Sequence, residues 1–211
     1  MSRLADGLSA EQLEITGVCP AEPADDLHAS IRSIILISPA PGFWAHFTQS
    51  AEYTDQTPDP MDRWSRRVIG RIAGDHNAKA CFPFGDPPFR PFLNWAKRSG
   101  RAWVSPVGPL VHDRHGLMIS YRGALGLTDT IAPTPGTNPC PTCAAPCLSA
   151  CPAGALSAGP YDVPKCKAYL DTAPGSGCMG AGCLVRRSCP VGQGIRHPNQ
   201  LAFHMKAFNP R

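Results

Sequence analysis

Cysteine is the residue type of this chain with the clearest capacity for chemistry, and its ten copies are unevenly spread. Eight of them fall between Cys140 and Cys189, whereas Cys19 and Cys81 stand alone. The first residues lack the basic start and the long apolar run of an export signal, which predicts a cytoplasmic protein with reduced thiols. Clustered thiols in such a protein indicate a metal centre rather than a disulfide framework.

The first group of cysteines has the spacing C-x2-C-x3-C-x3-C-P and comprises Cys140, Cys143, Cys147 and Cys151, followed by Pro152. Bacterial ferredoxins use C-x2-C-x2-C-x3-C-P, so one gap here is a single residue longer. A cubane cluster is wrapped by thiolates from a tight loop, and gaps of two or three residues place successive sulfurs on the inner side of that loop. The spacing therefore predicts a [4Fe–4S] cluster.

The segment downstream supplies the further thiols that a second cluster needs, and its last cysteine, Cys189, is again followed by proline. In two-cluster ferredoxins the last cysteine of the run binds the other cluster. This crossing predicts a first quartet of Cys140, Cys143, Cys147 and Cys189. It predicts a second quartet of Cys151, Cys166, Cys178 and Cys183.

Two other uses of these cysteines have to be weighed. Structural zinc is also held by four thiolates with C-x2-C spacing, although zinc does not account for two Cys-Pro endings. Disulfides fit neither the predicted compartment nor the spacing. We prefer iron–sulfur clusters, and zinc stays open as the alternative.

Composition separates the cysteine-rich part from the rest of the chain. Residues 135–199 hold 19 of the prolines and glycines, with five basic and two acidic residues. So many turn-forming residues with so few large apolar side chains cannot support an ordinary core. We expect an N-terminal extension at 1–27, an α/β domain at 28–131, a two-cluster module at 132–199 and a C-terminal tail at 200–211.

The elements expected upstream are a mixture of strands and helices. A β-branched run predicts a buried strand over residues 30–38, and apolar residues at helical spacing predict a helix over 59–73 that ends before Gly74. Shorter patterns predict strands at 80–82 and 102–104, a helix at 92–97, and one or two strands within 116–127. The mixture indicates an α+β or α/β domain.

The cysteine module is similar to that of a known superfamily. Its first run ends in Cys151-Pro-Ala-Gly-Ala, a lone Cys166 precedes Tyr169, and a second run ends in Cys189-Pro. In these features the chain resembles the epoxyqueuosine reductase and CblC-type cobalamin-processing superfamily. The resemblance implies a nitroreductase-like mixed-sheet domain followed by a small module that is ferredoxin-like and holds two [4Fe–4S] clusters. It also implies cobalamin as a further cofactor.

The same resemblance implies roles for two upstream residues. Arg122 precedes Gly123 in a stretch similar to one whose arginine holds glutathione near the corrinoid, which implies a cofactor-binding role. Asp86 lies in a stretch similar to the D-x-x-P segment of the reductases, which implies a catalytic proton donor. The residues alone favour a simpler interpretation, in which Arg122 is a structural or surface arginine and Asp86 is an ordinary loop carboxylate.

These observations predict an iron–sulfur oxidoreductase component that passes electrons through two clusters to a corrinoid or another small cofactor. It would serve as a cobalamin-linked reductase or an electron-transfer subunit, with a redox partner protein and a small-molecule substrate. The alternatives are a plain ferredoxin-type carrier and an interaction protein with structural clusters.

We expect no nucleic acid as a partner, because the arginines around Trp64 fit a solvated helix face. We expect no membrane either, since no apolar run approaches the ~20 residues that a membrane helix needs.

Overall fold

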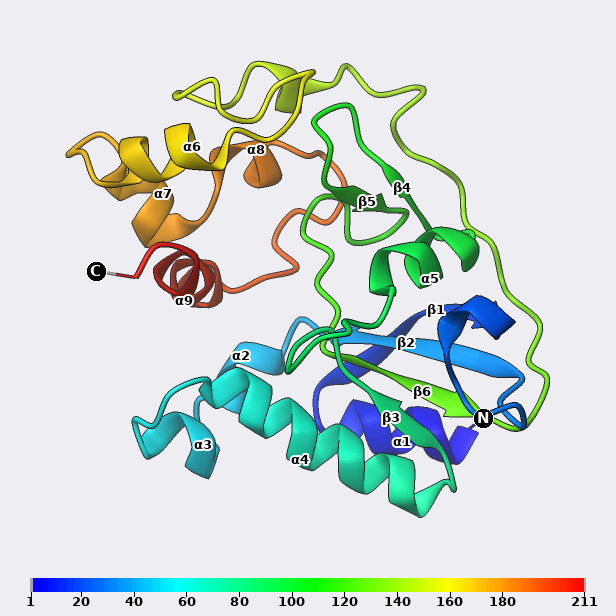
Figure 1. The fold of residues 1–211 in the computed structure, drawn as a ribbon. Helices are drawn as coiled ribbons and strands as arrows, with labels where there is room; N and C mark the ends of the chain where they lie inside the picture. The colour runs from blue at the N-terminus through cyan, green and yellow to red at the C-terminus, as the bar shows by residue number, and fades with distance from the viewer. Residues whose placement is uncertain (1, 211) are drawn as a thin grey trace. The chain divides into compact units, whose positions relative to one another are not determined.

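The computed structural model describes residues 2–210, which form two compact units (Figure 1). Unit 1 comprises Met1–Arg101 and Ser120–Thr137, and unit 2 comprises Ala102–Ile119 and Asn138–Arg211. The units depart from the expected domain ranges, because residues 102–119 group with the cysteine-rich part. Their side chains explain this, since Trp103 and Val111 pack in the same apolar cluster as the thiols of Cys147 and Cys189.

Unit 1 is built on a four-stranded antiparallel sheet with the order β1-β2-β6-β3. These strands are Leu13–Pro20, Ser33–Pro39, Gly123–Leu127 and Lys79–Cys81, in that order. Every residue of β2 is buried, as expected for the β-branched run at 30–38. The residues expected to form an N-terminal extension instead supply the edge strand β1, which pairs with β2 along its whole length.

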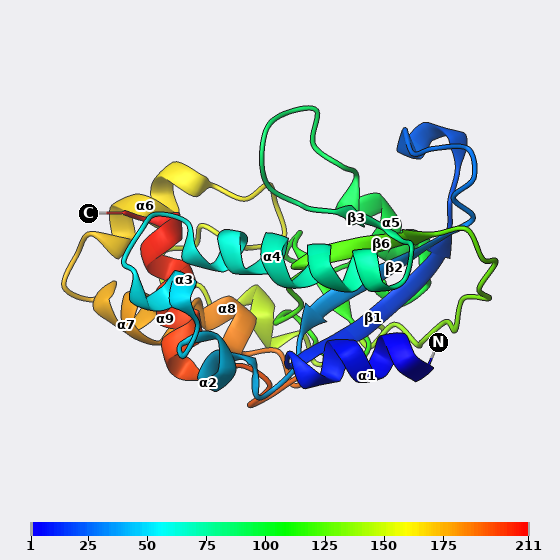
Figure 2. The same cartoon turned by 90° about the horizontal axis from the view of Figure 1, so that it is seen from below.

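Helices cover both faces of this sheet. Figures 1 and 2 show α1 (Ser2–Ala10) and α4 (Pro60–Asp75) on one face and α5 (Phe92–Arg98) on the other. The predicted helix at 59–73 is confirmed as α4, although it continues through Gly74 to Asp75. Between β2 and α4 lie the short helices α2 (Phe43–Phe47) and α3 (Ala51–Thr54), and a 3-10 turn, η1, spans Pro23–Asp25. Unit 1 is thus an α+β fold.

Unit 2 contains the hairpin β4 (Ala102–Val104) with β5 (Leu110–His112) and several short helical segments. These segments are η2 (Pro146–Leu148), α6 (Val163–Leu170), α7 (Ser176–Ala181), α8 (Leu184–Arg187) and α9 (Pro198–Phe208). The expected C-terminal tail is therefore mostly helix α9.

The strand expectation for 116–127 is correct only at its end, where β6 lies. Gly116 instead occupies a turn, with φ at +52°, and exchanges backbone hydrogen bonds with His112 at 2.9 and 3.0 Å. Its left-handed conformation is readily open to glycine and ends any continuous strand there.

A buried carboxylate fixes the η1 turn of unit 1 against α5. Asp25 is 2% exposed and accepts hydrogen bonds from Trp95 Nε1 at 2.7 Å, from the Glu22 N–H at 2.8 Å and from Arg98 Nη2 at 2.5 Å. Burial alone would raise the pKa of Asp25, but these hydrogen bonds outweigh it and hold the pKa below its ordinary value. Asp25 is therefore ionised and contributes to stability in that form.

We expect Asp25→Asn to lower the free energy of unfolding by about 3 kcal/mol at pH 7, because Arg98 loses its buried partner. The native pKa is depressed, so this contribution is complete above the ordinary aspartate pKa of about 4 and is lost as the pH falls through the native value. Urea unfolding at pH 7 and at pH 3 measures this. The difference in the free energy of unfolding between the unmodified protein and Asp25→Asn should be smaller at pH 3. Asp26→Asn is the matched control, because the Asp26 side chain is 88% exposed; an equal loss in both variants would contradict the argument.

Candidate metal centre

The four thiols of the first quartet line one small cavity of unit 2. Cys147 lies in η2 and Cys189 follows α8, while Cys140 and Cys143 lie in the turn before η2. Burial raises the pKa of Cys140, and the neighbouring thiols of Cys147, Cys189 and Cys143 raise it further. Cysteines nearly 50 residues apart along the chain are thus neighbours in space.

The second quartet lines a separate and larger cavity, of about 210 Å³. Cys166 lies in α6, Cys178 lies in α7, and Cys183 is the residue at which α8 begins. Cys151 reaches the same cavity from the turn that follows η2. The division of the eight thiols between two cavities is the crossed division that the spacing predicts.

The two cavities differ in size. The first is about 20 Å³, which is roughly the room of one water molecule. The cavity at the second quartet is therefore the roomier of the two.

Backbone N–H groups point at the sulfurs of both quartets. The Ala145 N–H donates to Cys143 Sγ at 3.4 Å, and the Ala155 N–H donates to Cys151 Sγ at 3.3 Å. Hydrogen bonds from the N–H groups at the start of α8 lower the pKa of Cys183, although burial is the larger influence and leaves it raised. Donors aimed at sulfur favour the thiolate, which is the form that binds metal.

A half-buried cation, Arg186, accompanies these thiols. Arg186, in α8, donates from Nε to the carbonyl of Leu117 at 2.7 Å and from Nη2 to the carbonyl of Ile119 at 3.3 Å. Within residues 2–210 no carboxylate pairs with Arg186, and burial lowers its pKa while the nearby Cys183 raises it. Its environment thus complements an anion in the second cavity, which Arg186 also lines.

Aromatic side chains close the second cavity. Tyr161 and Phe208 both line it and stack with their ring centres 6.3 Å apart, and Lys167 Nζ lies 5.3 Å from the Phe208 ring centre. Burial, and then the thiol of Cys166, raises the pKa of Tyr161. The sequence analysis missed these residues because neither belongs to a cysteine motif or to a periodic apolar pattern.

The two upstream candidates belong to unit 1. Asp86 is exposed in the loop between β3 and α5, with no hydrogen bond in the part of the chain described. Arg122 is buried, donates to Asp62 and to Ser65 Oγ (3.1 Å), and lies 5.2 Å from the ring centre of Phe84. The packing gives Arg122 a structural role within unit 1, and its cofactor role remains a prediction.

Cys19 and Cys81 also belong to unit 1, on strands β1 and β3. Both are buried, and burial raises the pKa of each, that of Cys19 to about 11. They are therefore protonated thiols of the sheet.

Other features bear on the candidate partners and cofactors. Within residues 2–210 all ten cysteines are free thiols, and no three His, Cys, Asp or Glu side chains converge on a point suited to a single metal ion.

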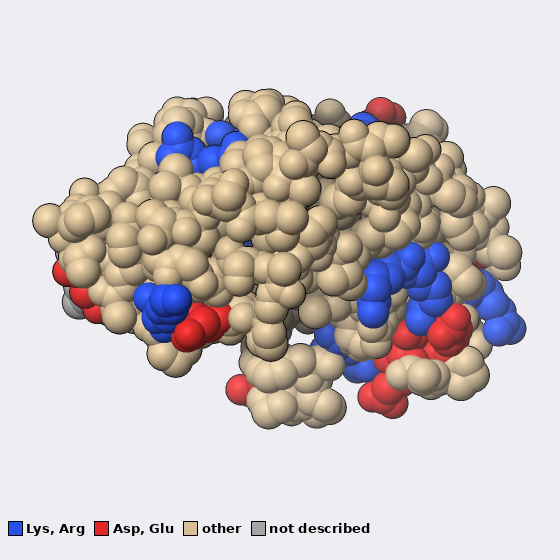
Figure 3. Space-filling model, turned by 90° about the horizontal axis from the view of Figure 1, so that it is seen from above, with Lys and Arg blue, Asp and Glu red and all other residues tan. Residues whose placement is uncertain are grey.

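The helices of this described part are all too short or too polar to cross a bilayer. On the face drawn in Figure 3, Lys and Arg side chains form small separate groups, several beside Asp and Glu, rather than a continuous basic stripe.

Comparison with protein families and with curated proteins found no match to this chain. The assignment of a function therefore depends on the geometry described above.

Gly116 provides a test of the first cavity. A Cβ at this position would lie 2.1 Å from the Val191 carbonyl oxygen and 2.8 Å from Cys189 Sγ, so we expect Gly116→Ala to displace Cys189 and to cost about 2–3 kcal/mol. Thermal unfolding and the rate of thiol labelling at Cys189 measure the two effects. Gly180→Ala, in α7, is the control, because nothing lies within 4 Å of its added Cβ. An unchanged labelling rate of Cys189 in Gly116→Ala would show that the close approach of Gly116 does not hold Cys189 in place.

Proposed function

We propose that unit 2 binds two [4Fe–4S] clusters, one in each quartet, and that the protein is an iron–sulfur oxidoreductase component that carries electrons. One observation supports this above the others. Eight thiols from two cysteine runs divide into two groups of four, each around one cavity, and each run contributes its last cysteine to the group of the other. That crossing is the pattern of two-cluster ferredoxins.

When bound, such clusters supply one-electron transfer. The residues of unit 2 would hold them by four thiolates each, with backbone N–H groups donating to Cys143 and Cys151. Arg186 would offset part of the negative charge of the thiolates, since it lies half-buried near Cys183 and no carboxylate pairs with it within the described residues. Charges taken out of water need such compensation.

The finer proposal is a reductase in which the clusters feed a corrinoid that acts on a small molecule. It is supported by the family resemblance alone and assigns roles to Arg122 and Asp86. Asp62 already holds the guanidinium of Arg122, so binding glutathione or another anion there would require that ion pair to open. Titration of the protein with cobalamins and flavins under anaerobic conditions tests this part, and an unchanged spectrum would leave a plain electron carrier.

We expect anaerobically reconstituted protein to contain roughly eight irons and eight sulfides per chain. Its visible absorption should bleach on addition of dithionite, because oxidised clusters accept one electron each. Iron, sulfide and zinc analysis of the same sample measures this. Stoichiometric zinc without sulfide would overturn the proposal in favour of structural zinc.

Single cysteine substitutions should show how much of the iron each quartet binds. We expect Cys143→Ala and Cys166→Ala each to remove about half of the iron, because each takes one thiolate from a different quartet. Each should also lower the resistance of unit 2 to proteolysis, since metal binding contributes folding energy. Cys81→Ala is the matched control, a buried thiol of unit 1 outside both quartets. Loss of all the iron in Cys81→Ala, or of none in the other two, would contradict the division.

A further inference from the structure

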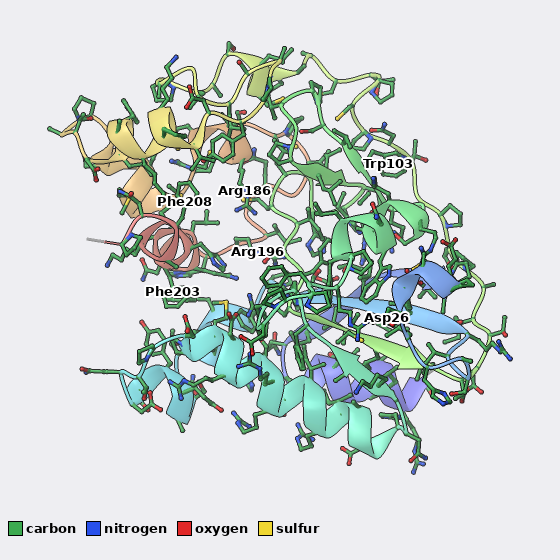
Figure 4. All side chains as sticks on the ribbon, viewed as in Figure 1. Asp26, Trp103, Arg186, Arg196, Phe203 and Phe208 are labelled. Carbon is green, nitrogen blue, oxygen red and sulfur yellow. The ribbon has the colours of Figure 1, made fainter. Side chains whose placement is uncertain are left out.

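The last helix of unit 2, α9, forms one side of the second cavity. Met205 and Phe208 of this helix line the cavity together with the four thiols of the second quartet. Figure 4 shows Phe208 at the side of α9 that faces α6, the helix that carries Cys166. The second thiol site is therefore completed by a helix that contains no cysteine and follows both cysteine runs.

The end of α9 is fixed to α6 and to the segment before it. The ring of Phe208 stacks on that of Tyr161 with the ring centres 6.3 Å apart, and Lys167 Nζ, from α6, lies 5.3 Å from the Phe208 ring centre. The next residue, Asn209, is buried, and its Nδ2 donates to Asp171 Oδ1 at 2.9 Å. These contacts involve no thiol, so they hold the end of α9 without any bound metal.

The first half of α9 is fixed to the turn between α7 and α8. Leu201 is buried and lies over Gly182, the residue that precedes Cys183. A Cβ at Gly182 would lie 2.7 Å from the Leu201 Cβ, so the helix approaches this turn as closely as glycine allows. The helix is thus held at two points, and the residues that line the second cavity lie on the part of α9 that follows Leu201.

We propose that α9 is a lid over the second quartet and sets the rate at which metal leaves it. Tyr161 is 39% exposed and Phe208 is partly exposed, so the stacked pair lies between solvent and the thiols that share its cavity. Apolar rings in that position hinder water and charged chelators, since a charge loses hydration on passing them. The inference rests on the proposed function only in that the second quartet must bind a metal.

The lid should act on one quartet alone. Among the described residues that line the first cavity, none belongs to α9. A change in α9 that opens the second cavity should therefore leave the first quartet as it was. This difference separates a lid from a general loosening of unit 2, which would expose both quartets.

Transfer of metal from the loaded full chain to excess EDTA, under anaerobic conditions and with pulses of iodoacetamide, tests the lid. A thiol is alkylated once its metal has left, so peptide mass spectrometry reports separately on Cys178 of the second quartet and Cys147 of the first. We expect Phe208→Ala to speed alkylation of Cys178 about tenfold or more and to leave Cys147 unchanged. Lys206→Ala, on the same helix but outside the cavity lining, is the control and should change neither rate.

A second variant covers the case in which Phe208→Ala does not fold. Asn209→Ala keeps the aromatic cover but frees the end of α9 from Asp171, so it should speed alkylation of Cys178 by a smaller factor. An unchanged rate at Cys178 in the folded variants would overturn the inference. Equal acceleration at Cys178 and Cys147 would overturn it as well.

Metal and sulfide analysis of the same samples keeps the two proposals apart. Zinc without sulfide would remove the cluster proposal, and the release of that zinc would still test the lid. Iron with sulfide whose release from the second quartet is unaffected by Phe208→Ala would remove the lid alone.

Discussion

The grouping of eight thiols around two cavities is the constraint on which unit 2 depends. Its fully buried apolar side chains are few and small, and the core cluster that contains Val111, Leu117 and Val185 also contains Cys147 and Cys189. Unit 1, by contrast, buries Trp64, Trp95 and a strand of isoleucines in a conventional core. A unit with so thin an apolar core needs another source of stability, and metal bound by the thiols would supply it directly as folding free energy.

The excess of basic residues near the thiols fits the same constraint. Residues 135–199 carry five basic residues against two acidic ones, and the basic side chains include the half-buried Arg186, which lines the second cavity. Its guanidinium donates to two carbonyl oxygens and pairs with no carboxylate within the described residues. Clusters bound by thiolates would place a compensating negative charge near it. The net charge of +4 belongs to the whole chain and is counted with neutral thiols. Clusters bound by thiolates would bring it closer to zero.

Local patterns in the sequence predict the strands and helices that are periodic, and the cysteine spacing predicts the grouping of the thiols. The strand at β2, the helices α4 and α5 and the hairpin strand β4 lie close to where these patterns place them. The edge strand β1, the placement of residues 102–119 in unit 2 and the helix α9 were missed. Each depends on a partner distant in sequence, as β1 depends on β2. The Tyr161–Phe208 stack was missed for the same reason, since only the folded chain brings the segment before α6 next to the end of α9.

Each quartet draws its cysteines from both runs. Cys151 leaves the first run to complete the second quartet, and Cys189 leaves the second run to complete the first, so neither site can form from one segment alone. Along the chain, helix α8 lies between a cysteine of each quartet. Cys183, of the second quartet, immediately precedes the helix, and Cys189, of the first quartet, follows it shortly. The same helix carries Arg186, which lines the second cavity, and Val185, which packs in the apolar cluster with Cys147 and Cys189. One short helix thus contributes to the surroundings of both quartets.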